Sequence, residues 1–198
     1  MIKVGITGGI ATGKSFVANI IRDQKIPVIS ADIISREVVE PGETSYQKIV
    51  TEFGDQILNL DKTLNRKKLG EIVFNDPKKL SQLNQIIQPE IFQRIIETLS
   101  LFEEKQTPLI FVEIPLLFEN DYQKILDQTW VVTTDPEKQI EYLIRRDNIS
   151  KEQAQTRIQT QMTQEDKIKL ADIAIDNSKS ENETKETVIK LLSEFSYE

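Results

Sequence analysis

Cysteine and histidine are both absent from the 198 residues of this sequence. Without cysteine, the chain can form neither disulfides nor thiolate metal sites. Without histidine, it cannot use Ser-His or Cys-His nucleophilic catalysis, an imidazole general base or a zinc–imidazole site. Any proton transfer must therefore depend on the side chains of Asp, Glu, Lys or Tyr.

Long apolar runs are also missing, since no stretch approaches the roughly 18 consecutive apolar residues that a membrane span needs. Residues 1–10 are apolar but interrupted by glycines, and they lack the charged, apolar and cleavable parts of a signal peptide. A net charge of −7 provides no positive field for general nucleic-acid binding. We expect a cytoplasmic monomer or small homo-oligomer with no membrane or nucleic-acid partner.

Short apolar runs alternate with helical patterns along much of the chain. Apolar residues recur at helical spacing from Lys14 to Lys25 and predict a helix there. Strands that alternate with helices indicate an α/β fold with a parallel sheet. The runs predicted as strands are residues 2–7, 26–29, 109–114, 129–134 and 171–175.

Two stretches without such runs predict helical insertions in the α/β core. The first, residues 35–107, opens with a turn at Pro41-Gly42 and is expected to be interrupted at Asp76-Pro77 and Gln88-Pro89. The second, residues 136–170, predicts two exposed helices that meet near Ser150, a suitable N-cap. A last helix is expected over residues 181–195, and we assign it no chemistry.

The segment from Gly8 to Ser15 satisfies the pattern G-x-x-x-x-G-K-[ST] in full, between a predicted strand and a predicted helix. Gly8 and Gly13 allow backbone angles and close approaches that a side chain would block. The loop N–H groups then form an anion nest at the positive end of the following helix. Lys14 reaches the β- and γ-phosphates of a nucleotide, and the Ser15 hydroxyl can bind the Mg²⁺ that bridges them. This segment therefore predicts binding of a nucleoside triphosphate.

The rest of the sequence favours a small-molecule kinase over other nucleotide-binding classes. The N-K-x-D and D-x-x-G elements of GTPases are absent, and the predicted strand 109–114 offers only one acid, Glu113, where an assembly ATPase has Asp-Glu. Two helical insertions suit an enzyme that closes over both substrates and excludes water. Glu113 could bind Mg²⁺ through water or serve as a structural hydrogen-bond acceptor, and the sequence leaves both open.

Asp32 follows the second predicted strand, at the sheet edge where α/β proteins bind ligands. A carboxylate there could orient and deprotonate an acceptor hydroxyl, or hold Mg²⁺ through water. It could also cap the next helix, which is compatible with either role. Trp130 lies in an apolar strand and is predicted as a core residue rather than an adenine platform.

Motifs spread from residue 3 to about residue 178 resemble those of the dephospho-CoA kinase family. The V-V-E-P-G and P-L-L-F-E elements are much more specific to it than the phosphate-binding loop. The matching elements are Thr7–Ile10 with Gly13–Ser15, Ala31–Arg36, Val38–Gly42, Pro115–Glu119, Arg146-Asp147, Arg157 with Gln161, and Ala171-Asp172 through Ile175–Asn177.

This resemblance implies ATP-dependent phosphorylation of the ribose 3′-hydroxyl of dephospho-CoA, which gives CoA and ADP in the last step of coenzyme A synthesis. It implies a P-loop core with a five-stranded parallel sheet, like that of nucleoside monophosphate kinases. The core would comprise residues 1–34, 108–135 and 171–198. Residues 35–107 would form the acceptor (CoA-side) domain, and residues 136–170 the lid.

The resemblance also implies roles for individual residues. Lys14, Asp32 and Arg146 would be catalytic, with Asp32 as the general base. Asp32 and Arg36 would bind the acceptor, and Ser15 would bind Mg²⁺. The expected ATP-binding residues are Gly9, Ala11, Thr12, Gly13, Lys14, Ser15, Phe16, Arg146, Arg157 and Asn177.

The sequence departs from the family pattern at several positions. Ser30 stands where Asp is frequent, Gln88 where a His precedes Pro, and Tyr142 where Arg is frequent. The run Arg66-Lys67-Lys68 could meet acceptor phosphates or form a solvated helix face. Two alternatives stay open from the residues alone: a kinase for another acceptor, such as a nucleoside monophosphate, and a nucleotide-binding regulator without turnover.

Overall fold

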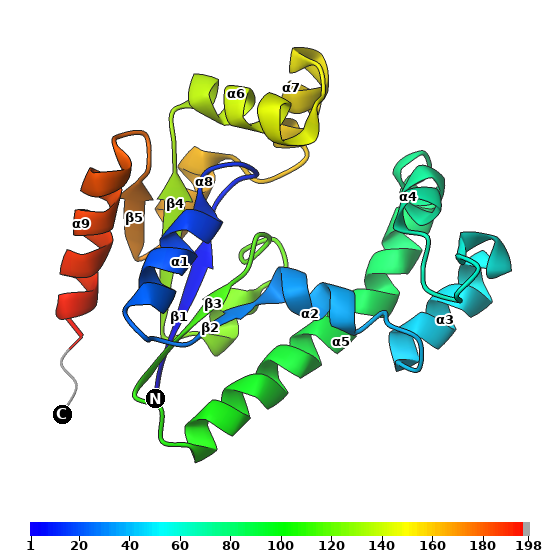
Figure 1. Cartoon of the computed structure of the whole chain (residues 1–198), viewed down its shortest axis with the longest axis horizontal. Coiled ribbons are helices and arrows are strands. Elements are labelled where there is room, and N and C mark those ends of the chain that lie inside the picture. The colour runs from blue at the N-terminus through cyan, green and yellow to red at the C-terminus, as the bar shows by residue number, and fades with distance from the viewer. Residues whose placement is uncertain (196–198) are drawn as a thin grey trace. The chain divides into compact units, whose positions relative to one another are not determined.

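The computed structural model describes residues 1–195, which contain a parallel sheet of five strands in the order β2-β3-β1-β4-β5 (Figure 1). Every neighbouring pair in this sheet runs parallel. The predicted α/β class and parallel sheet are therefore confirmed. The strands are β1 (Ile2–Thr7), β2 (Val28–Ser30), β3 (Leu109–Glu113), β4 (Gln128–Thr133) and β5 (Ile173–Asp176).

The chain divides into two compact units. The first combines Met1–Ser30 with the chain from Phe102 onward and contains the whole sheet, and the second is Ala31–Leu101. Among the described residues, none of the helices combines the length and apolar character needed to cross a membrane. The helices are α1 (Lys14–Asp23), α2 (Ala31–Glu37), α3 (Thr44–Phe53), α4 (Arg66–Phe74), α5 (Pro77–Glu104), α6 (Pro136–Asp147), α7 (Lys151–Gln159), α8 (Gln164–Leu170) and α9 (Glu181–Ser193), with short 3-10 turns at Asp55–Ile57 and Tyr122–Ile125.

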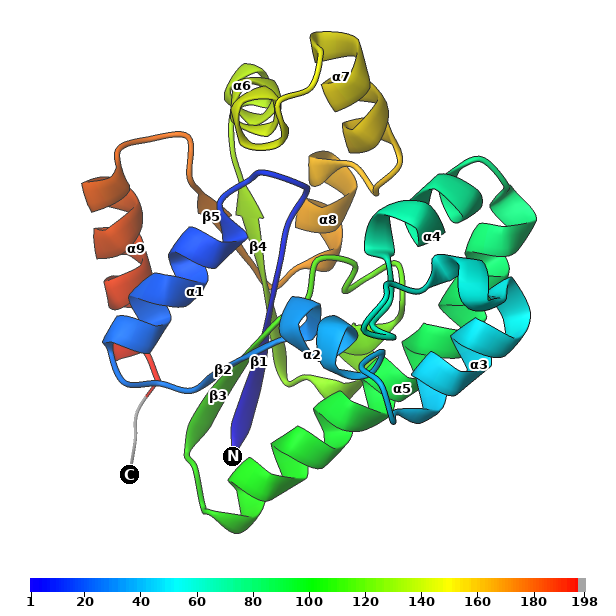
Figure 2. The same ribbon diagram turned by 45° about the vertical axis from the view of Figure 1, so that its right-hand side comes forward.

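The core of the sheet-containing unit forms where α1 and α9 pack together against one face of the sheet (Figures 1 and 2). Trp130 of β4 is fully buried there, and its ring makes an edge contact with Phe111 of β3, with 5.0 Å between the ring centroids. Ile21 of α1 and Val188 of α9 are also fully buried in this cluster. The prediction that Trp130 belongs to the core is confirmed.

Prolines lie at two of the predicted boundaries, one of which differs from the structure. β2 begins at Val28 rather than Ile26, and Pro27 before it has no N–H to give to a ladder. The expected break at Asp76-Pro77 is confirmed, because α4 ends at Phe74 and α5 begins at Pro77.

The expected break at Gln88-Pro89 is wrong, since Pro89 lies inside the 28-residue helix α5. A proline removes one helical hydrogen bond and crowds the preceding turn, but it does not have to end a long helix. Ile91, Ile95 and Leu99 recur at every fourth position after it and are all buried. The packing of this apolar stripe therefore maintains the helix beyond the proline.

The region of residues 136–170 contains α6, α7 and α8 rather than the two helices that were predicted. The proposed N-cap is confirmed: Ser150 Oγ accepts from Gln153 N–H at 3.2 Å, and Gln153 Oε1 accepts from Ser150 N–H at 2.9 Å. The additional helix α8 begins after Thr163, whose hydroxyl accepts from Asp166 N–H at 3.1 Å. The expectation of exposed helices fails at Lys167, which is fully buried.

Candidate nucleotide-binding site

The loop between β1 and α1 has the backbone shape that its glycines predict. Gly13 adopts a φ of +96°, and a Cβ at this position would collide with the side-chain amide of Asn177. A Cβ at Gly8 would collide with the backbone oxygen of Val132. Glycine is therefore required at both positions for two reasons: the backbone angle, and a neighbouring atom that leaves no room for a Cβ.

Lys14 is the first residue of α1, and its ammonium group lies on the loop. Lys14 Nζ donates to the carbonyl oxygens of Gly8 at 3.0 Å and Gly9 at 2.8 Å. Its positive charge is thereby added to the N–H groups at the start of α1, which already favour an anion. The sequence prediction of a phosphate-binding loop thus has its expected local geometry.

Ser15 and Glu113 place two oxygen donors side by side. Ser15 Oγ donates to Glu113 Oε1 at 2.7 Å, and Glu113 is buried at the carboxyl end of β3. Arg22 Nη2 lies 3.7 Å from Glu113 Oε2 and offsets part of the carboxylate charge. Hydroxyl and carboxylate oxygens are ligands that Mg²⁺ accepts. Within residues 1–195 no three acidic side chains gather into a metal site, so a cation here needs further oxygens from phosphate or water.

Asn177 follows β5 and holds the loop from the side of α9. Asn177 Nδ2 donates to Thr12 O at 3.0 Å, and Asn177 Oδ1 accepts from Thr184 Oγ1 at 3.1 Å. Thr12 Oγ1 donates to Gly9 O at 3.0 Å within the loop. Asn177, which the sequence predicts as an ATP-binding residue, thus contacts the phosphate-binding loop itself.

Two glutamines contact the loop at Ile10. Gln161 Oε1 accepts from Ile10 N–H at 2.8 Å, and Gln139 Nε2 donates to Ile10 O at 2.7 Å. Gln161 belongs to a motif that the sequence revealed, although no role was assigned to it. Gln139 was missed, and its only sequence signal is its position on the same face of α6 as Leu143 and Arg146.

The two predicted lid arginines meet at one carboxylate. Asp147 Oδ1 lies 2.8 Å from Arg146 Nε, and Asp147 Oδ2 lies 2.6 Å from Arg157 Nη1. The hydrogen bond from Arg146, together with the charges of Arg146 and Arg157, holds the pKa of Asp147 below its usual value. Arg145 instead lies over the ring of Tyr142, 6.0 Å from its centroid.

An ion pair joins buried Lys167 to Glu119, the last residue of the P-L-L-F-E element. Lys167 Nζ lies 2.9 Å from Glu119 Oε1 and donates to Pro115 O at 3.0 Å. Thr7 Oγ1, at the end of β1, donates to the same Pro115 oxygen at 3.1 Å. Burial lowers the pKa of Lys167, while its hydrogen bond to Glu119 opposes that shift. This network ties α8 to the strand that leads into the loop.

The predicted acceptor residues lie in the helical unit Ala31–Leu101. Asp32 and Arg36 are both exposed on α2, one turn apart and therefore on the same face. Arg66 Nη2 donates to Arg36 O at 3.4 Å and lies 3.8 Å from Glu40 Oε1 of the V-V-E-P-G element. Arg66 is therefore the member of the basic run that reaches α2.

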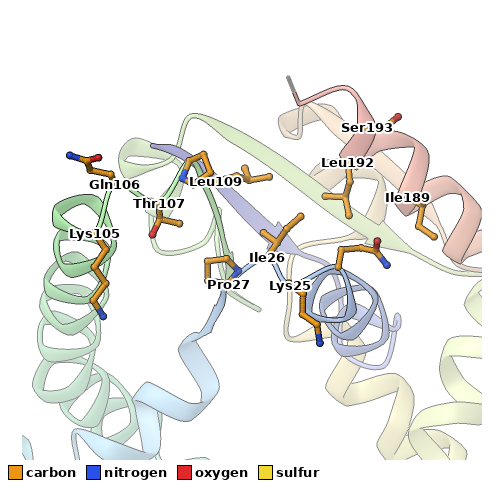
Figure 3. A pocket seen from close by; sticks show the side chains of 12 residues that line it. Lys25, Ile26, Pro27, Lys105, Gln106, Thr107, Leu109, Ile189, Leu192 and Ser193 are labelled. Atoms are coloured by element: carbon orange, nitrogen blue, oxygen red, sulfur yellow. The ribbon is translucent and has the colours of Figure 1, made fainter. Parts of the chain in front are cut away.

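A cavity of about 660 Å³ lies far from this chemistry (Figure 3). Ile26 and Pro27 line it before β2, Thr107 and Pro108 line it before β3, and Leu192 contributes from α9. These residues mark the amino ends of the strands, whereas the loop leaves the carboxyl end of β1. The cavity is therefore not the nucleotide site.

Comparison with known proteins identifies a matching family model and similar proteins of known sequence and structure. A family model described as dephospho-CoA kinase matches residues 2–183. A dephospho-CoA kinase of Listeria monocytogenes serotype 4b is 42% identical over 192 residues, which cover 97% of this chain and 96% of the relative. The structure of TT1252 from Thermus thermophilus matches with a TM-score of 0.83 at 30% identity, covering 99% and 98% of the two chains. A dephospho-CoA kinase from Campylobacter jejuni matches with a TM-score of 0.75 at 31% identity, covering 97% and 96%.

We expect Gly13→Ala to abolish measurable ATP binding, because the added Cβ meets Asn177 in addition to the strained backbone angle. Gly54→Ala is the matched control, since Gly54 has a φ of +76° with open space around its Cβ position. The control should lose only about 1–3 kcal/mol of unfolding free energy, the cost of an alanine at φ +76° and ψ 168°, a backbone region almost exclusive to glycine. Calorimetric titration with ATP and urea unfolding measure both effects. Equal losses in the two variants would contradict the role given to the Asn177 contact.

Proposed function

Because this chain belongs to the dephospho-CoA kinase family, we propose that its loop from Gly8 to Ser15 holds the ATP whose γ-phosphate passes to the ribose 3′-hydroxyl of dephospho-CoA. The activity is ATP-dependent phosphorylation of dephospho-CoA in coenzyme A synthesis. The observation that carries the residue assignment is the loop itself, in which Lys14 and the first N–H groups of α1 form one positive site. We place the reaction in the cytoplasm and take the chain as a monomer or small homo-oligomer.

Phosphoryl transfer requires the protein to position the two substrates and to neutralise the negative charge that spreads over the transferred group. The loop N–H groups would bind the phosphate oxygens, while the Lys14 ammonium turns from the loop carbonyls to the β- and γ-phosphates. Arg146 and Arg157 of the lid would add positive charge on the far side of the transferred group. Asp147 supports this role because it already gathers both guanidinium groups at one carboxylate.

The residues around Ser15 fit a Mg²⁺ ion. The Ser15 hydroxyl would bind the ion directly, and the adjacent Glu113 carboxylate would hold a water ligand of it. Such an ion supplies charge neutralisation across the β- and γ-phosphates. Glu113 then has two functions, since it also fixes the direction of the Ser15 hydroxyl.

Asp32 is assigned as the group that accepts the proton of the acceptor hydroxyl. It is the second residue after β2, and β2 ends at the same sheet edge as β1. Its exposed carboxylate shares a helix face with Arg36, which would bind the anionic acceptor. On this proposal the unit Ala31–Leu101 is the acceptor domain, and α6 to α8 form the lid.

Purified protein should release ADP from ATP when dephospho-CoA is present and should release little with nucleoside monophosphates. A coupled spectrophotometric assay with each acceptor measures this directly. ADP release with AMP or UMP at a comparable rate would reassign the acceptor. ATP binding without acceptor-dependent turnover would indicate a nucleotide-binding regulator.

Asp32→Asn should lower kcat by about 10²- to 10⁴-fold, the usual size of a general-base contribution, with little effect on the KM for ATP. Lys14→Ala should instead impair ATP binding and turnover together, because Lys14 would contact the phosphates both when ATP binds and during the transfer. Steady-state kinetics with both substrates varied separate the two patterns, and circular dichroism confirms the fold. A near-normal kcat in Asp32→Asn would exclude it as the base.

Glu113→Gln should raise the free Mg²⁺ concentration for half-maximal activity by about tenfold or more, as for other groups that orient metal ligands. The amide still accepts the Ser15 hydrogen bond but loses the charge that holds the water ligand. Turnover against free Mg²⁺ at fixed ATP gives the measurement. Glu186→Gln, at an exposed position on α9, serves as the control. An unchanged Mg²⁺ requirement in both variants would leave Glu113 a purely structural acceptor.

A further inference from the structure

The peptide groups of Ile10, in the middle of the phosphate-binding loop, are both bound by side chains from the lid region. Its N–H donates to Gln161 Oε1 at 2.8 Å, and its C=O accepts from Gln139 Nε2 at 2.7 Å. One residue of the loop is thus held through its donor and its acceptor at once. Gly9 is close as well, since a Cβ there would lie 2.9 Å from Gln139 Nε2.

Gln139 is held in turn by a second glutamine. Gln164 Nε2 donates to Gln139 Oε1 at 3.1 Å and to Thr134 O at 3.2 Å, while Gln164 Oε1 accepts from Thr134 N–H at 2.9 Å. The Thr134 backbone, which fixes both ends of the Gln164 amide, directly follows β4. The direction of each amide is therefore determined by its neighbour along a chain that runs from β4 to Ile10.

The positions of these glutamines connect the loop with the cations of the lid. Gln139 and Arg146 lie seven residues apart on α6, which places them on one face of the helix. Gln161 follows α7, which carries Arg157 in its last turn. A displacement of α6 or α7 that moves an arginine therefore also moves a hydrogen-bond partner of Ile10.

A purely structural role accounts less well for these contacts. Gln139 is only 3% exposed, and a buried amide side chain costs free energy unless all its groups are paired. An apolar side chain would pack at this place without that cost. The Gln139 amide instead donates to a loop carbonyl and accepts from Gln164.

We propose that Gln139 and Gln161 are positioning residues that hold the Ile10 peptide in the phosphate-binding shape and couple the lid to the loop. The inference rests on the proposed use of this loop for ATP. It assigns opposite hydrogen-bond directions to the two amides: Gln139 must donate, whereas Gln161 must accept. A carboxylate can replace the second amide but not the first.

The test applies the same substitution at both positions. Gln139→Glu loses the donor to Ile10 O and should raise the Kd and KM for ATP about tenfold or more, with the KM for dephospho-CoA unchanged. Gln161→Glu keeps an acceptor for Ile10 N–H and should change the Kd and KM for ATP less than threefold. Both variants add one negative charge, so their difference reports the hydrogen bond. Gln155→Glu, at an exposed position on α7, controls for charge on the lid.

Methionine variants provide the second measurement, because methionine has a similar length and carries no charge. Gln139→Met and Gln161→Met should both weaken ATP binding in calorimetry with Mg-ATP alone. The amide proton of Ile10, followed by NMR, should exchange faster in Gln161→Met than in the unmodified protein. Calorimetry and NMR need no acceptor, so they test the coupling even if the acceptor were another molecule.

Equal ATP affinity in Gln139→Glu and Gln161→Glu would overturn the assigned hydrogen-bond directions. Equal rises in the KM values for ATP and dephospho-CoA would overturn the coupling to the loop. If Gln139→Glu does not fold, the ATP affinity of Gln139→Met is the deciding measurement. Unaltered ATP binding in that variant would contradict the proposal.

Discussion

The shape of one loop backbone, from Gly8 to Ser15, is the constraint on which the site depends. Side chains distant in sequence hold it from two directions: Asn177 binds Thr12 O, and Gln139 with Gln161 binds both peptide groups of Ile10. An anion nest works only when its N–H groups converge, and a free loop of this length would adopt many other shapes. The late part of the chain thus prepares a site whose recognisable motif lies near its start.

On the proposed residue assignment, the charge distribution explains how an acidic protein can bind two anionic substrates. The net charge is −7, yet Lys14, Arg146 and Arg157 are each placed by a specific oxygen partner. Cations held at defined positions act on a bound phosphate far more than dispersed surface charge, which water and salt screen. Asp147 shows the same principle, because its lowered pKa reflects the two guanidinium groups that it gathers.

Local sequence patterns could predict most of the fold and the loop at the centre of the proposed site. The spacing of glycines, Lys14 and Ser15 predicts the loop, and the apolar runs predict the strands, because both depend on residues close in sequence. The proline at position 89 misled the prediction, since the buried stripe of α5 outweighs a local helix breaker. Lys167 was expected on a surface and is buried, because its partner Glu119 comes from another segment. The contacts of Gln139 with Ile10 could not be predicted, as they join residues 129 positions apart.

The most direct test of the account is the identity of the phosphorylated product. The purified protein is incubated with Mg-ATP and dephospho-CoA, and the product is examined by mass spectrometry and ³¹P NMR. The account predicts a product heavier by one phosphoryl group, with a new phosphomonoester on the ribose 3′-oxygen and one ADP formed for each. Free inorganic phosphate with unmodified dephospho-CoA, or a phosphate on another oxygen, would contradict it.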